Sequence, residues 1–250
     1  LSDGKTSSVE VDLPMRPDFD FLVTPGGNLT AADSRDIYEV IRDEMNAARK
    51  PGDIRDYLRK LIHQSEPAAG NPAIQTRIHR PAATTSSATA VLMVQTGSLD
   101  PNPRAKEVIA GGEVLMTLVP RGLPVAAPNN YAADWITATR AWLVGMNLPA
   151  MRARDIMAAA EKLLNEPGVK QVRIEASDTA GVWALLAASQ MDKSKLAGVR
   201  IERAPHSVRQ AYESPIHRAL HDVTMPGFAA SFDLDDVVKL VGADKVEWWD

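Results

Sequence analysis

The chain has 250 residues, 45% of them hydrophobic and 24% charged, a balance typical of a folded globular protein and not of a disordered one. Its formal net charge is −4 and no Lys/Arg-rich run stands out, so nucleic acid is not an expected partner. The absence of cysteine excludes disulfides, thiolate catalysis and Cys-ligated zinc, and no apolar stretch reaches the roughly 20 residues of a membrane span.

The N-terminal part is predicted to hold two amphipathic helices. Residues 1–32 are rich in Pro, Gly, Asp and Ser and are expected to be irregular. Ile37, Ile41 and Met45 then recur at helical spacing, and Pro51-Gly52 ends that pattern. The second helix carries one apolar face, formed by Ile54, Tyr57, Leu58, Leu61 and Ile62. We predict an N-terminal extension over residues 1–69, whose apolar faces must dock elsewhere on the protein.

The remaining part of the chain alternates short apolar strands with helices. Strands are predicted near residues 74–79, 90–94, 113–119, 172–175, 199–202 and 245–249, and helices over 132–145, 151–165, 180–190 and 233–241. Such alternation indicates βαβ units and a mainly parallel sheet with helices on both faces. The predicted fold class is therefore a three-layer α/β fold over residues 70–250.

Three stretches carry a resemblance to a known family: residues 152–169, residues 172–188, and residues 232–238 together with 245–250. In that order they resemble the helix before the nucleophile strand, the nucleophile turn, and the segment that bears the acidic residue in the α/β-hydrolase superfamily. The likeness is greatest to bacterial acetyl-xylan-esterase and prolyl-oligopeptidase-like hydrolases. It implies an α/β-hydrolase-like domain that is truncated at its C-terminus.

The nucleophile turn departs from the family's Gly-x-Ser-x-Gly pattern. Alignment on Gly181 places Asp178 at the nucleophile position and Ser177 one residue earlier. Three interpretations stay open: Ser177 or Asp178 caps the following helix, Asp178 is an attacking carboxylate, or Ser177 is a displaced nucleophile. Ala176 and Ala180 replace glycines, and alanine resists the backbone angles of a strained elbow, which argues against both catalytic interpretations.

The other catalytic groups are implied by the resemblance. Asp250, after the last strand, matches the family's acidic residue, and its histidine partner would lie beyond Asp250 or on another chain. The candidate oxyanion-hole amides are those of Gly97, after an early strand, and Thr179, at the start of a helix. The chain's own histidines are His63, His79, His206, His217 and His221. None has the family's expected position, and the last two lack the glutamate of a zinc motif, so no metal is predicted.

The resemblance implies a carboxylic-ester hydrolase that acts on a small-molecule or carbohydrate ester, with acetylated carbohydrate as the proposed substrate. The competing hypothesis is a catalytically silent hydrolase-like domain that serves binding or assembly. No cofactor is expected, because no Gly-rich phosphate loop is present. A protein partner or a missing C-terminal segment is expected beside Trp248 and Trp249. Because the chain lacks cysteine and begins at Leu1, periplasmic or secreted and cytoplasmic locations remain equally open.

Overall fold

The computed structural model describes residues 35, 37–48, 52–64, 74–81, 88–123, 131–213 and 220–249. Asp250, His217 and the predicted boundary between residues 69 and 70 lie outside this part of the chain. Within it, no helix is both long and apolar enough to cross a membrane.

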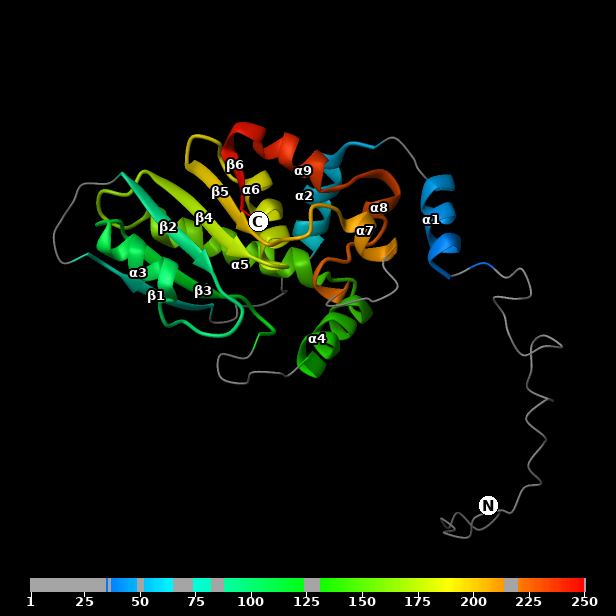
Figure 1. Ribbon diagram of the computed structural model, residues 1–250, viewed down its shortest axis with the longest axis horizontal. Coiled ribbons are helices and arrows are strands. Elements are labelled where there is room, and N and C mark those ends of the chain that lie inside the picture. The colour runs from blue at the N-terminus through cyan, green and yellow to red at the C-terminus, as the bar shows by residue number, and fades with distance from the viewer. Residues whose placement is uncertain are drawn as a thin grey trace, which may run out of the picture.

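One mainly parallel sheet runs through the molecule (Figure 1). Its strands lie in the order β1-β3-β2-β4-β5-β6. Their bounds are β1 (Gln75–His79), β2 (Thr89–Val94), β3 (Leu115–Val119), β4 (Gln171–Ser177), β5 (Leu196–Glu202) and β6 (Val246–Trp249). β1 pairs with β3 in antiparallel fashion, and the other neighbouring strands are parallel. The predicted strands and the mainly parallel sheet are confirmed.

Helices precede β1 in the chain and connect the parallel strands. They are α1 (Ile37–Ala47), α2 (Ile54–Gln64), α3 (Pro103–Ala110), α4 (Tyr131–Leu143), α5 (Leu148–Leu164), α6 (Ala180–Gln190), α7 (Val208–Glu213), α8 (Phe228–Ser231) and α9 (Leu234–Val241), with 3-10 turns η3 (Leu220–Asp222) and η4 (Ala243–Lys245). Asp233 begins α9 through a capping box with Asp236. The helix predicted over residues 180–190 has the bounds of α6.

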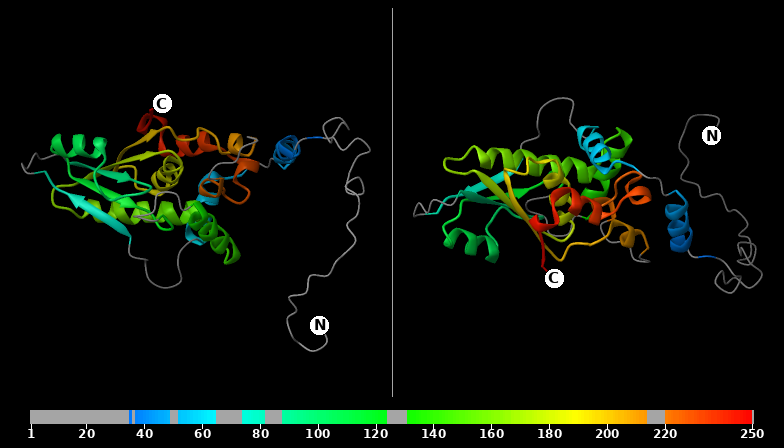
Figure 2. Two further views of the ribbon diagram at one scale, coloured as in Figure 1. Left: turned by 60° about the horizontal axis from the view of Figure 1, so that its bottom comes forward. Right: turned by 90° about the horizontal axis from the view of Figure 1, so that it is seen from above.

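The elements form three layers, with α3 on one face of the sheet and α5 on the other (Figure 2). The larger hydrophobic core lies on the α5 and α6 side and includes residues of α2 and α9. A smaller core lies beneath α3 and consists of Val91, Met93, Ala105, Val108 and Leu115. β2 and β3 are therefore buried on both faces, which explains their continuous apolar runs.

Helix α2 of the predicted extension docks on the sheet domain. Leu58 and Ile62 are buried in the larger core. Tyr57 packs against Phe232, with ring centroids 5.6 Å apart, and its hydroxyl donates to the Pro226 carbonyl oxygen at 2.7 Å. The expectation that an apolar face of the extension must dock is confirmed for α2.

Candidate functional site

The turn between β4 and α6 holds a strained residue. Asp178 has φ = 53°, in the left-handed region that side chains other than glycine rarely adopt. Its amide donates to the Glu202 carbonyl oxygen at 2.9 Å, and the Gly181 amide donates to the Asp178 carbonyl oxygen at 3.0 Å. The sharp strand-to-helix turn expected at the nucleophile position is therefore present, with Asp178 at its apex.

The alanines of this turn do not carry the strain. Ala176 and Ala180 are buried and have negative φ, so the expectation that they resist the elbow is wrong: the unusual angle falls on Asp178. Gly181 is required for packing instead. A Cβ there would lie 2.5 Å from Ile201 Cγ2 and 2.7 Å from Ala204 Cβ. Close approach of α6 to β5 explains this glycine.

Neither the Ser177 nor the Asp178 side chain caps α6. Thr179 occupies the N-cap position without a capping side-chain hydrogen bond, and within the described residues neither the Ser177 nor the Asp178 side chain accepts a hydrogen bond from the first helical amides. The capping interpretation is therefore wrong. The Asp178 side chain is 60% exposed, and its Oδ1 lies 3.8 Å from Arg203 Nε. In the described part of the chain, no hydrogen bond joins Ser177 or Asp178 to a histidine.

The two candidate oxyanion-hole residues lie in different surroundings. Gly97 is exposed in the loop after β2, with open space where a Cβ would stand. Thr179 Oγ1 lies 3.4 Å from Asp222 Oδ2 as a weak hydrogen bond. Their oxyanion role stays a prediction, as does the acidic role of Asp250, which lies outside the described residues.

A buried ion pair between Arg152 and Asp222 lies next to the start of α6. Arg152 on α5 is fully buried, and its Nη1 donates to Asp222 Oδ1 at 2.6 Å. The Trp183 indole on α6 donates to the Asp222 carbonyl oxygen at 2.6 Å, and the Arg152 guanidinium lies 4.3 Å from that ring's centroid. These contacts join α5, α6 and η3, and they give Asp222 a structural role next to Thr179.

Two of the described histidines, His206 and His221, lie against other side chains of the fold. His206 stacks on Trp248, with centroids 4.2 Å apart and planes inclined by 24°. His221 Nε2 lies 3.5 Å from Asp222 Oδ1. Burial lowers the pKa of His79 on β1. Among the described residues, no group of three His, Cys, Asp or Glu side chains could hold a metal ion.

A cleft of about 440 Å³ opens between α3 and the carboxyl ends of β2, β4, β5 and β6. Its polar wall consists of Asn102, Arg104, Glu107, Glu175, Ser177, Arg200 and Glu202, and Trp249 closes one side. Asp178 does not line it. The two candidate nucleophiles of the turn therefore point to different places. Ser177 lines the cleft, whereas the Asp178 side chain lies beside Arg203 and is exposed to solvent.

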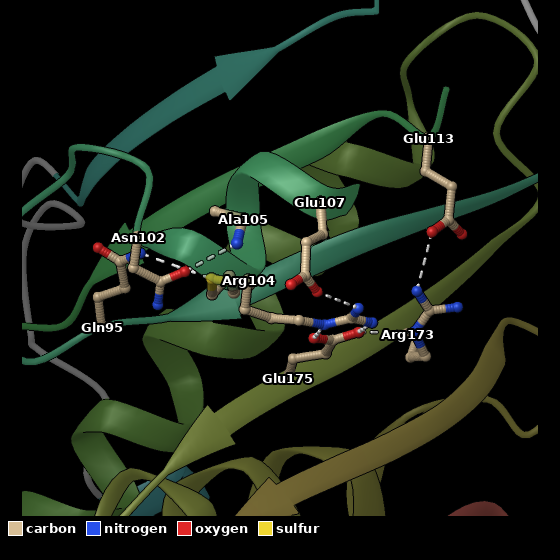
Figure 3. A network of polar contacts seen from close by, with 9 residues as sticks. Gln95, Asn102, Arg104, Ala105, Glu107, Glu113, Arg173 and Glu175 are labelled. Carbon is tan, nitrogen blue, oxygen red and sulfur yellow. Dashed lines mark hydrogen bonds and ion pairs between the residues drawn. The ribbon is translucent and has the colours of Figure 1, made fainter. Parts of the chain in front are cut away.

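A charged network forms the floor of this cleft (Figure 3). Glu175, whose side chain is 6% exposed, accepts hydrogen bonds from Arg104 Nε at 2.9 Å, Arg104 Nη2 at 3.0 Å and Arg173 Nε at 3.0 Å. Arg104 Nη1 also donates to Glu107, and Arg173 Nη2 to Glu113. Burial alone would raise the pKa of Glu175, but the hydrogen bonds from both arginines outweigh it and hold that pKa below its ordinary value.

Apart from Ser177, the sequence interpretation missed the residues of this cleft and of its charged network. A signal was present: Arg173, Glu175 and Ser177 alternate with apolar residues along one strand, which places all three on the same face. The partners on α3 and β5 could not be read in the same way, because they depend on how distant segments pack.

Comparison with known proteins supports the fold. No protein-family model matches the chain, and no curated protein sequence matches it. Among solved structures, a putative acetyl xylan esterase from Bacteroides fragilis is similar with a TM-score of 0.60 and 11% identity, over 87% of this chain and 83% of that one. Acetyl xylan esterase 1 from Thermoanaerobacterium sp. gives a TM-score of 0.53 and 10% identity, over 86% of this chain and 92% of its own. The chain has the fold of the α/β hydrolases.

Proposed function

We propose that this protein is a hydrolase-fold domain that binds a small ligand in the cleft beneath α3 and does not hydrolyse esters. The observation that carries the proposal is the composition of the nucleophile turn. Its apex holds Asp178, whose carboxylate is largely exposed and faces Arg203, and the neighbouring hydroxyl of Ser177 has no histidine partner among the described residues.

The surroundings of Ser177 and Asp178 favour ligand binding over ester hydrolysis. A serine hydroxyl becomes a nucleophile only when a base within hydrogen-bond reach takes its proton. An attacking carboxylate must be held against the substrate, whereas Asp178 stands outside the cleft wall. The cleft itself has the size and the mixture of apolar and polar groups that small-molecule sites require.

Hydrolysis of a carboxylic ester is the second candidate function. It is favoured by the hydroxyl of Ser177, which lines the cleft, and by the strained turn, which is retained at Asp178. By analogy with the two esterases of similar fold, the substrate in that case is an acetylated carbohydrate.

Turnover of short acyl nitrophenyl esters and of acetylated xylan by the full-length protein distinguishes the two. We expect release of nitrophenol and acetate at the uncatalysed rate, unchanged in Ser177→Ala and Asp178→Ala. Turnover that is lost in one of these variants, while thermal unfolding stays as in the parent protein, would reject the binding proposal and identify the nucleophile.

A further inference from the structure

Arg200 lies in the cleft wall, and no carboxylate of the described residues pairs with it. It extends from β5, and its guanidinium carbon lies 3.2 Å from the centroid of the Trp249 ring. It makes no ion pair or hydrogen bond through its side chain with any described residue. Its neighbours in register on β4 and β6 are Glu175 and Glu247, yet neither lies within ion-pair distance.

The carboxylates that line the cleft are engaged by other arginines. Glu175 accepts from Arg104 and Arg173, and Glu107 accepts from Arg104. Glu202 accepts from Arg203. Arg200 is thus the cleft cation whose charge no described carboxylate balances at close range, and stacking on Trp249 holds its planar face.

Two further hydrogen-bond donors line the same cleft. Asn102 Oδ1 accepts from the Ala105 amide at 2.8 Å, so its Nδ2 group remains available as a donor. The Ser177 hydroxyl makes no hydrogen bond with a described residue. Met93, Val94 and Pro103 supply apolar surface beside these groups.

We propose that the cleft binds a small organic monocarboxylate, whose carboxylate pairs with Arg200 and accepts from Asn102 and Ser177. A guanidinium presents a planar pair of donors that matches a carboxylate. One unbalanced cation suits a monoanion better than a phosphate dianion, and the apolar surface suits an organic group. This inference rests on the proposed binding function and names its ligand class.

The test uses the full-length protein and NMR titration with benzoate, its uncharged isostere benzamide, and inorganic phosphate. We expect saturable binding of benzoate and none of benzamide or phosphate at the same millimolar concentrations. Arg200→Gln should weaken benzoate binding by roughly tenfold or more, because it removes the charge-assisted hydrogen bonds. Arg59→Gln removes the same charge from an exposed ion pair on α2 and should leave binding unchanged.

Asn102→Asp gives a second variant that preserves the fold. It keeps the oxygen that caps α3 but replaces the Nδ2 donors with a negative charge, so benzoate binding should be lost while thermal unfolding stays near that of the parent. Equal binding of benzamide, stronger binding of phosphate, an unaffected Arg200→Gln variant, or no saturable binding of benzoate would each overturn the proposal. Any of these results with ester turnover still absent would remove the carboxylate assignment alone. Ester turnover would instead reject the proposed function.

Discussion

The backbone at Asp178 determines which side chains the turn after β4 accepts. Its φ of 53° favours Gly, Asn or Asp and is strongly disfavoured for β-branched residues. We therefore expect Asp178→Gly to change the free energy of unfolding by less than about 1 kcal/mol, and Asp178→Val to lower it by about 1–2 kcal/mol. Urea unfolding measures both. Equal stability of the two variants would show that the turn is not strained.

Glu175 in the cleft floor makes the free energy of unfolding depend on pH. Its folded-state pKa is lowered by Arg104 and Arg173 despite burial, so the stability it contributes is present above the ordinary pKa of about 4.3 and is lost as pH falls through the folded value. Glu175→Gln should lower the free energy of unfolding by about 1–2 kcal/mol at neutral pH. This is a modest figure, because Arg104 and Arg173 remain 36% and 28% exposed.

Urea unfolding of the parent and Glu175→Gln at a series of pH values tests the sign. The difference between the two proteins should be constant above pH about 5 and should shrink as the pH falls below about 4. A difference that stays constant or grows toward acid would contradict the assignment of a lowered pKa.

At the scale of elements, the contact between α6 and β5 depends on one glycine. Gly181→Ala would place a methyl group against Ile201 and Ala204, and it should lower the free energy of unfolding by about 1–3 kcal/mol. Gly97→Ala is the matched control, since a Cβ there meets open space, and its effect should be within about 0.5 kcal/mol. Thermal unfolding of both variants checks the prediction, and similar losses would argue against close packing at Gly181.

The same elements show what the sequence could predict. The bounds of α6 follow from its run of small and apolar residues between a polar turn and Met191, and the parallel strands follow from their continuous apolar runs. Alignment on Gly181 placed Asp178 at the nucleophile position, but the family's glycine pattern suggested that the unusual backbone angles would fall on residues 176 and 180. Only the path of the backbone into α6 shows which residue takes the left-handed angle.

At the scale of the whole molecule, α3 covers β2 and β3, while β4 and β5 present charged residues on the same face of the sheet. The cleft forms because α3 covers β2 and β3 but leaves the charged residues of β4 and β5 uncovered. Arg104 and Glu175 meet there although they are 71 residues apart in the chain, so no local pattern could predict their contact. The resemblance to α/β hydrolases predicted the fold and the turn at Asp178, but not the cleft beside that turn.

The proposed binding function requires that Ser177 is not an activated nucleophile. The most direct measurement is the intact mass of the full-length protein after incubation with a fluorophosphonate, which reacts covalently with activated serines. We predict an unchanged mass, because no described histidine or other base is hydrogen-bonded to the Ser177 hydroxyl. A single adduct that maps to Ser177 and is absent from Ser177→Ala would contradict it.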